Sequence, residues 1–541
     1  RVLCSAGADA NAVKTQGGTA LHVAADSNAP EAARALLEDC GADQSILLLG
    51  DTTALYLAAQ HGFTAVVDVL VSHGEKRRSG RGADALNHVM PRVVSSALTQ
   101  PSKNPIEVAS EASPEDRLKL ELTKYNNPSA DPSRPGFEMG NGATALHAAV
   151  ENGHLETALL LLRRGARQVA SMEGASPLYT AVEYNRPEIA RELLAHGGDP
   201  NDTKTRDGNT PLHVAILRRR RHLVDVLLHS GKVHVDRPNK AGATSLHIAI
   251  HMGDVDTVVK LLAAGADPNV PDTSGNTALH FAASAPGSVV EDMVAGLVRK
   301  GGDVKRGNKQ SQTPLALATD MKRHTAVAAL LHHGAPPNAK DKDDVTSLMV
   351  AAAQGDLEAV RLLLRFHADP NIKASLQKHT RSTALHFAAT KGHTDVVRYL
   401  VEDGADVNVR LAHGPSALML AVMAGSTDCV DVLLSRGARV DVRDSTGLTS
   451  LFHAVLGGHS PIVDRLVAAG ATVDVIRRSD GATPLLVAAQ AGDLKSAETL
   501  VVQGGANISA TRTDGANVSH LFAAALPVSK DVNAILAEWV P

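Results

Sequence analysis

The stretch Asp-Gly-Asn-Thr-Pro-Leu-His-Val-Ala at residues 207–215 decides the fold, because variants of it recur along the chain of 541 residues. In each variant a Thr or Ser is followed two positions later by Leu and five positions later by Ala, and the pattern returns about every 33 to 34 residues. A constant spacing of about 20 to 50 residues indicates a repeat architecture. The Thr or Ser, termed the anchor, stands at Thr19, Thr53, Thr144, Ser176, Thr210, Thr244, Thr277, Thr313, Thr346, Thr383, Ser416, Thr449, Thr483 and Ser519.

Each repeat predicts two helices joined by a tight turn. The anchor hydroxyl suits an N-cap, because it can accept a hydrogen bond from an unpaired N–H of the first helical turn. Nine residues after the anchor, a Gly or Asn that tolerates a left-handed backbone is expected to end the first helix. A second apolar stretch follows and ends at another glycine, as at Gly74 and Gly504. Between repeats we expect an extended finger that closes in a turn with positive φ, with Gly two residues before the next anchor.

The unit resembles an ankyrin repeat, whose signature Asp-Gly-x-Thr-Pro-Leu-His-x-Ala is matched by residues 207–215. The resemblance covers nearly the whole chain. It implies an all-α solenoid of stacked helix-turn-helix units with β-turn finger connections, which grips protein partners on its concave face and fingers and catalyses nothing. It also implies that the histidines three residues after the anchor are structural and hold adjacent turns together through their rings: His22, His147, His213, His247, His280 and His386.

One interval departs from the period: Thr53 and Thr144 lie 91 residues apart. We therefore expect N-terminal repeats at residues 1–74, the first of them incomplete, an insertion at 75–139, and a main array at 140–541 with a divergent C-terminal capping repeat. The insertion is rich in Pro and Ser and is predicted to be disordered. Within it, residues 113–122 fit a helix start and an alternating strand equally well. The insertion is either a tolerated surface loop or a partner motif or phosphorylation switch.

Several repeats break the glycine pattern. Arg219, Pro286, Lys322 and Val528 stand where the inter-helix Gly or Asn is expected, so those turns must be rebuilt or strained. A non-Gly residue in the left-handed region costs roughly 1 kcal/mol. The second glycine is replaced at Cys40, Val298, His367 and Val540, with small shifts suggested by Gly41 and Gly301.

Composition excludes several classes of protein. Aromatic residues make up only 2% of the chain and the formal net charge is −4, so stacking on bases and a global field for phosphate or anionic lipid are not expected. No apolar run approaches the roughly 20 residues that span a bilayer. Cys4, Cys40 and Cys429 are not closely paired in the sequence, so we expect neither a disulfide framework nor a zinc–thiolate site, and a reducing compartment.

No catalytic or cofactor motif is visible. The chain has no Walker spacing, no His-Glu-x-x-His helix and no Gly-x-Ser-x-Gly elbow. His324, His332 and His333 lack a Cys or carboxylate at ligand spacing, so we expect no metal and no cofactor. The basic run at residues 217–222 falls between two helices and is read as a solvated edge, with a nuclear-import signal or a local phosphate contact as alternatives. We expect a monomeric cytoplasmic protein, with a nuclear location possible, that binds proteins but not nucleic acid and does not insert into membranes.

The candidate binding residues are those that packing leaves free to vary. At the end of the first helix, seven and eight residues after the anchor, we expect Tyr184, Arg218 and Met252 to anchor a partner, because such side chains dominate or adapt to interfaces. Gln354 and Lys391 occupy the same position. A polar rim is expected from the finger residues Arg206, Asp207, Asn239, Lys240, Ser274, Lys342, Asp343, Arg443, Asp444 and Arg478.

The leading hypothesis is a non-catalytic scaffold or adaptor. The alternative is a targeting or regulatory segment of a larger protein, such as an enzyme, a ubiquitin-ligase substrate receptor or a channel, whose effector domain precedes Arg1; the broken first repeat motivates it. A third class, an enzyme housed in the array or insertion, is disfavoured because about 58 residues poor in apolar groups are too few for an independent domain.

Overall fold

The computed structural model consists of two-helix repeats, as the period predicts. It describes residues 2–14, 18–44, 46–48, 52–79, 143–171, 174–204, 206–285, 287, 289–375, 381–411, 414–525, 534 and 537. In these ranges the regular elements are helices. Isolated antiparallel β-bridges, such as Lys340–Thr346 and Arg410–Ser416, occur at the bases of some fingers. The chain divides into two compact units, residues 1–248 and 249–541, within helix α14 (Ser245–His251).

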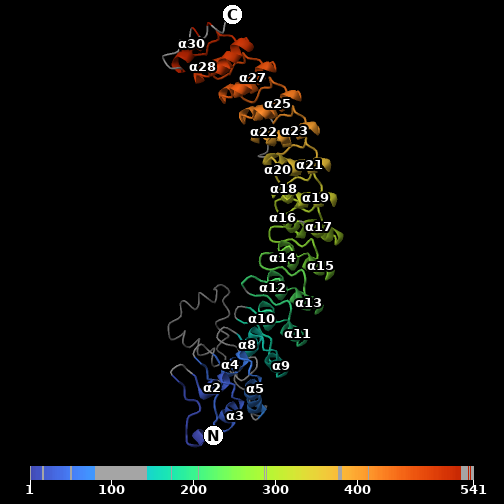
Figure 1. The fold of residues 1–541 in the computed structure, drawn as a ribbon, viewed down its shortest axis with the longest axis vertical. Helices are drawn as coiled ribbons and strands as arrows, with labels where there is room; N and C mark the ends of the chain where they lie inside the picture. Colours follow the sequence, from blue (N-terminus) through green and yellow to red (C-terminus); the bar gives the residue numbers. More distant parts are fainter. Residues whose placement is uncertain are drawn as a thin grey trace, which may run out of the picture. The chain divides into compact units, whose positions relative to one another are not determined.

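The first unit is two layers of helices (Figure 1). From α2 to α12 each first helix packs on the first helix of the next repeat, and from α3 to α13 each second helix does the same in its own layer. The first helices are α2 (Ala20–Asp26), α4 (Ala54–Gln60), α8 (Ala145–Asn152), α10 (Pro177–Glu183) and α12 (Pro211–Leu217). The second helices are α1 (Val2–Ser5), α3 (Pro30–Glu38), α5 (Thr64–Ser79), α9 (Leu155–Arg163), α11 (Pro187–Ala195) and α13 (Arg221–His229).

The second unit repeats this arrangement. Its first helices are α16 (Ala278–Ser284), α18 (Pro314–Asp320), α20 (Ser347–Gln354), α22 (Ala384–Lys391), α24 (Ala417–Met423), α26 (Ser450–Leu456), α28 (Pro484–Ala491) and α30 (Val518–Ala525). Its second helices are α15 (Val255–Ala263), α17 (Val290–Arg299), α19 (His324–His332), α21 (Leu357–Arg365), α23 (Thr394–Glu402), α25 (Thr427–Ser435), α27 (Ser460–Ala468) and α29 (Leu494–Glu498), the last continued by a π-helical turn (Thr499–Gln503).

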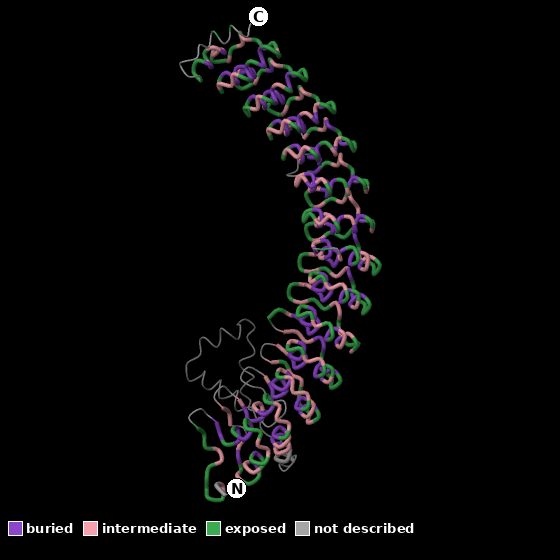
Figure 2. Tube along the Cα trace, viewed as in Figure 1, coloured by how far each residue is buried: buried purple, intermediate pink, exposed green. Residues whose placement is uncertain are grey.

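The buried core runs between the two layers of each unit (Figure 2). In most repeats the Leu two residues after the anchor and the Ala five residues after it are almost fully buried, as are Leu146 and Ala149, each 0% exposed. A single repeat has no core of its own, so each apolar stripe is covered only by stacking on its neighbours. The small Ala side chain allows the first helix of the next repeat to approach closely.

The anchor and the histidine after it form a reciprocal cap. Thr144 Oγ1 accepts a hydrogen bond from the backbone N–H of His147, and His147 Nδ1 accepts one from the N–H of Thr144 at 3.1 Å. The other ring nitrogen lies 3.0 Å from the carbonyl oxygen of Ala175 in the next finger, so it donates. The same contacts recur at His213 and His280, which confirms the structural role expected for these histidines.

The glycine between the helices is explained by the neighbouring repeat. Gly355 has φ of 68°, and a Cβ added to it would lie 2.7 Å from the ring of His393. The ring lies there because His393 Nε2 donates to the carbonyl of Ala353 at 3.2 Å, at the end of the preceding first helix. His154 and Arg186 make the equivalent contact in the first unit, to the carbonyls of Gln60 and Glu151. These cationic or polar groups satisfy carbonyls that a helix end leaves unpaired.

Replacing Gly355 by Ala should therefore cost more than replacing a glycine with the same backbone but open space. Gly437 has φ of 82° and no atom within 4 Å of an added Cβ. We expect Gly437→Ala to lower the free energy of unfolding by about 1 kcal/mol and Gly355→Ala by about 2 to 3 kcal/mol, since the His393 hydrogen bond is lost as well. Urea unfolding of both variants measures this, and equal losses would contradict the packing explanation.

An Asn at the start of several fingers joins neighbouring repeats. Asn371 Nδ2 donates to the carbonyl of Gly404 at 3.1 Å, and its Oδ1 accepts from the N–H of Asp406 at 2.8 Å. Asn201 makes the corresponding pair of bonds in the first unit, with the carbonyl of Lys232 and the N–H of His234. The recurring Ala-Asp-x-Asn sequence is thus a hydrogen-bonded ladder along the stack.

Three predicted helix boundaries were wrong. Helix α30 begins at Val518 and is preceded by Asn517, whose Oδ1 accepts from the N–H of His520 at 2.9 Å, so Ser519 lies in the first turn and is not the anchor. The reason is that Asn caps a helix as well as Ser, and Val518 and Phe522 are then the buried pair at helical spacing, each 1% exposed.

The other two concern second helices. Helix α5 does not end at Gly74 but continues to Ser79, because no finger sequence follows and Lys and Arg favour helix. In the repeat of α29, the positive φ falls on Gly505 (66°) and not on Gly504, because the π-helical turn adds one residue to the last turn.

The other irregular turns follow the sequence-based expectation. Arg219 (56°), Lys322 (54°) and His367 (64°) have positive φ and are the strained positions. Gly41 and Gly301 also have positive φ, which confirms that the second glycine is shifted in their repeats. Pro286, Val528 and Val540 lie outside the described residues, as does most of the expected insertion. Around it, α4 packs on α8 and α5 on α9, so the repeats on both sides of residues 80–142 stack directly.

The expectation about cysteine was also wrong. The structure contains a disulfide between Cys4 and Cys40, with a Cα–Cα distance of 5.5 Å, and Cys429 is free and buried. The two half-cystines are separated by 36 residues, which is close to the length of one repeat. The stacking of repeats therefore brings them side by side on neighbouring repeats.

Candidate functional site

The candidate surface is formed, within each unit, by the fingers and by the last turn of the first helices; it is termed the finger face. Eleven of the fifteen residues expected to bind a partner are exposed on it: Tyr184, Arg206, Asp207, Arg218, Lys240, Ser274, Lys342, Asp343, Lys391, Arg443 and Arg478. The remaining four are half-buried: Asn239, Met252, Gln354 and Asp444.

Three of the half-buried residues are engaged within the protein. Asn239 Oδ1 accepts from the N–H groups of Ala241 and Ala243, which closes its finger turn. Asp444 accepts from His453 Nε2 at 2.7 Å, and Gln354 Nε2 donates to the carbonyl of Asp320 at 2.9 Å in the preceding repeat. These side chains shape the surface and are poorly placed to contact a partner.

Exposed apolar side chains at the same repeat position were missed as candidates. In the first unit Leu217 ends α12 and is 42% exposed, and Tyr184, 45% exposed, directly follows α10, which packs on α12. In the second unit Met321, Met423 and Leu456 are 43%, 55% and 47% exposed. The signal was present in the sequence, since all of them lie seven or eight residues after an anchor.

In the first unit a charged pair borders the apolar side chains. Lys204 Nζ, from a finger, lies 3.9 Å from Glu183 Oε2 at the end of α10 and 5.8 Å from the centroid of the Tyr179 ring. Burial raises the pKa of Tyr179, so the phenol stays neutral. The finger is thus tied to the first helix, and Tyr184 follows directly on this pair.

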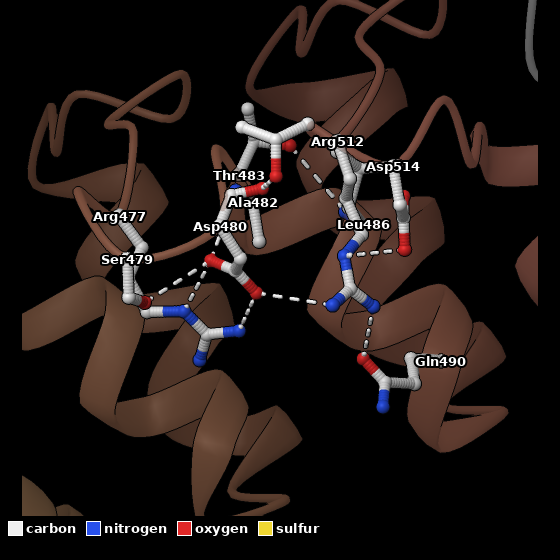
Figure 3. A network of polar contacts seen from close by, with 10 residues as sticks. Arg477, Ser479, Asp480, Ala482, Thr483, Leu486, Gln490, Arg512 and Asp514 are labelled. Atoms are coloured by element: carbon white, nitrogen blue, oxygen red, sulfur yellow. Dashed lines mark hydrogen bonds and ion pairs between the residues drawn. The ribbon is translucent and has the colours of Figure 1, made fainter.

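In the second unit two fingers are joined by a network of ion pairs (Figure 3). Arg477 and Arg512 approach the carboxylate of Asp480 from two sides: Arg477 Nε lies 2.8 Å from Oδ1, and Arg512 Nη2 lies 3.2 Å from Oδ2. Arg512 Nη1 also donates to Gln490 Oε1 at 3.1 Å, at the end of α28. The guanidinium of Arg477 stacks over the ring of Phe452, 5.5 Å from its centroid.

These contacts fix the charge of the fingers. The hydrogen bonds from Arg477 hold the pKa of Asp480 well below its usual value. Burial alone would raise the pKa of Asp444, but hydrogen bonds from Thr446, His453 and Leu448 hold it below its usual value. Both carboxylates stay ionised at neutral pH, and the finger face keeps a defined pattern of charge.

Nothing in the described part of the chain suggests a metal centre. No group of three or more His, Cys, Asp or Glu residues among the described residues is arranged to hold a metal ion. Likewise, none of the described helices is both long and apolar enough to pass through a bilayer.

The chain belongs to the ankyrin-repeat family. The family "Ankyrin repeats (3 copies)" matches residues 1–80, 112–204, 197–272, 246–341, 348–444 and 418–512. Ankyrin repeats are protein–protein interaction modules and are generally non-catalytic, so the family implies protein partners for this chain.

The chain is similar, over short segments, to proteins of different kinds. It is 37% identical over 107 residues to the B-cell lymphoma 3 protein homolog of Mus musculus, which is 19% of this chain and 23% of that protein. It is 34% identical over 139 residues to the E3 ubiquitin-protein ligase hecd-1 of Caenorhabditis elegans, 24% of this chain and 5% of the ligase. It is 38% identical over 72 residues to the transient receptor potential channel pyrexia of Drosophila melanogaster, 13% of this chain and 7% of the channel. The matches therefore span less than a quarter of each relative.

Proposed function

We propose that the chain is a non-catalytic scaffold that binds protein partners on its finger face. One observation carries the proposal: exposed apolar side chains recur at the end of the first helix, as at Tyr184 and Leu217, beside finger residues held in ion pairs such as Lys204–Glu183. An apolar centre with a polar rim is the usual anatomy of a protein interface. Tyr184 and Arg218 are the strongest anchors, because Tyr and Arg are enriched among residues that dominate binding energy.

Apolar-to-charge substitutions on this face should abolish partner capture. We expect the variant Tyr184→Glu/Leu217→Glu/Met423→Glu/Leu456→Glu to lose at least about tenfold in affinity for partners that the wild-type chain captures, because each Glu must be desolvated at the interface. Affinity capture followed by titration with each identified partner measures this.

The matched control is Val259→Glu, compared with Tyr184→Glu alone so that each variant carries one new charge; Val259 is an apolar residue, 58% exposed, on the second helix α15. It should leave capture unchanged. Undiminished affinity in the finger-face variant, with an unchanged thermal unfolding curve, would refute the assignment. Deletion of residues 75–139 in parallel separates binding by the insertion from binding by the finger face.

A second function is favoured by the relatives. The ligase and the channel each carry the matched segment as a small share of their length, 5% and 7%. By analogy the chain would be the targeting or regulatory segment of a larger protein that carries an effector domain. Sequencing the complete transcript tests this: an upstream effector supports it, whereas a start codon directly before the first repeat removes it.

A further inference from the structure

A groove on the outer side of the first unit, away from the finger face, has the features of a ligand site. It lies between the second helices α11 and α13, has a volume of about 460 Å³, and is lined by side chains of both helices and of the loop that follows α13. This volume is within the range of about 300 to 1,000 Å³ that is typical of ligand sites. Its apolar lining comes from Leu194, which is buried, Val226, which is half-buried, and Ala195, which is exposed.

The rim of the groove is basic. Arg191 on α11 and Lys232 after α13 carry permanent positive charge, and the imidazoles of His222 and His229 stand beside them. Asp225 is the one carboxylate among the residues that line it. Two cations and two imidazoles against one carboxylate, beside an apolar lining, favour an anionic ligand with apolar side chains.

The basic side chains are available to a ligand. Within the described residues, the side chains of Arg191, His222 and Lys232 make no hydrogen bond or ion pair, and each is exposed. His229 uses Nδ1 to donate to the carbonyl of Asp225 at 2.7 Å, and its Nε2 makes no hydrogen bond among the described residues. By contrast Arg164, also on this layer, is already paired with Asp68 at 2.6 Å.

The hydrogen-bond donors in the walls of the groove indicate which kind of anionic ligand it can bind. Its walls are the flanks of helices, whose backbone N–H groups are used within the helices, and Ser230 Oγ already donates to the carbonyl of Leu227 at 2.6 Å. No cradle of backbone donors is offered to a compact phosphate, of the kind found at helix N-termini. Cations on two different elements, beside an apolar lining, instead match carboxylates spread along a peptide. A second copy of the chain fits poorly, because a symmetric contact would place the basic rim against itself.

We propose that the groove between α11 and α13 binds an acidic peptide segment of a partner protein, with Arg191 and Lys232 pairing with its carboxylates and Leu194, Ala195 and Val226 receiving an apolar side chain. This site is independent of the finger face, so a partner could engage both.

The test uses the full chain and the fluorescein-labelled peptide Glu-Asp-Glu-Leu-Leu-Glu-Asp-Glu in fluorescence anisotropy. We expect saturable binding that weakens as salt is added. Arg191→Glu/Lys232→Glu should weaken it at least about tenfold, because both rim charges are reversed. Ala195→Trp should also abolish binding, since the indole fills the groove without changing its charge.

The matched control is Arg365→Glu/Arg398→Glu, which makes the same change of charge on exposed arginines of the second helices α21 and α23. It should leave binding unchanged. The proposal is overturned if the peptide does not bind, if Ala195→Trp binds like wild type, or if the control pair weakens binding as much as the groove pair. Equal competition by inorganic phosphate at constant ionic strength, binding only to phosphatidylserine vesicles, or a dimer that hides the groove in sedimentation would overturn it as well.

Discussion

The chain should lose stability in acid as the pH falls from 6.5 to about 4, a loss that begins above the range in which ordinary carboxylates are protonated. Burial lowers the pKa of His213 and of His386 to about 4, and it also lowers the pKa of His22, His147 and His280. His213 Nδ1 accepts from the N–H and faces the hydroxyl of Thr210, so a proton there would break the cap. The folded state therefore keeps these rings neutral.

The direction of the change in stability with pH follows from proton binding. Above pH 6.5 the rings are neutral in both states, and they do not affect stability. As the pH falls from 6.5 to about 4, the unfolded chain binds protons that the folded chain does not, and His213 and His386 each cost about 1.4 kcal/mol per pH unit. His213 and His386 should each remove about 3 kcal/mol from the stability of their own unit by pH 4.

Urea unfolding at a series of pH values measures the loss, and NMR titration of the histidine Cε1–H resonances measures each pKa directly. Stability that stays constant between pH 6.5 and 5, or buried rings that titrate near pH 6.5 in the folded chain, would contradict the expected result. Loss confined to pH below 4 would instead point to carboxylates such as Asp444, whose pKa is lowered.

Removal of the Cys4–Cys40 disulfide should destabilise the N-terminal repeats by about 4 kcal/mol. The bond closes a loop of 36 residues, and a cross-link of that length reduces the entropy of the unfolded chain by about this free energy. In a repeat stack the loss should stay close to the bond, because each repeat contacts only its neighbours.

Hydrogen exchange followed by mass spectrometry locates the effect. In Cys40→Ser, amides of α2 and α3 should exchange roughly a hundredfold faster or more, while those of α22 to α28 should not change. Adding reductant to the wild-type chain should reproduce the loss and should have no further effect on Cys40→Ser. Cys429→Ser is the control that must keep its response to reductant, and a wild-type chain indifferent to reductant would show that the bond does not stabilise the fold.

The sequence predicted most of the fold because its rules act locally. Anchors such as Thr144 and the Gly or Asn nine residues later specify helix ends, and the period specifies the stacking of repeats. The prediction failed at two helix ends. Asn517 replaces Ser519 as the cap of one helix, and a π-helical turn moves the positive φ to Gly505 at the end of another. The disulfide was missed because proximity was judged along the chain, although a separation of 36 residues is close to one repeat.

The binding surface was predicted less well than the fold. Repeat position indicates that residues such as Tyr184 and Arg218 are exposed, but it does not show which side chains are used internally. Asn239 and Asp444 were expected to contact a partner, and the structure places their oxygens in finger hydrogen bonds. The groove between α11 and α13 depends on side chains from two repeats, and no single-repeat pattern contains it.

A hydrogen-exchange footprint of the chain bound to a captured partner tests most directly whether the finger face is the protein-binding surface. We expect protection in consecutive fingers of one unit, such as residues 271–276 and 306–312, and in the last turns of the adjacent first helices. A bound complex in which no finger gains protection would contradict it.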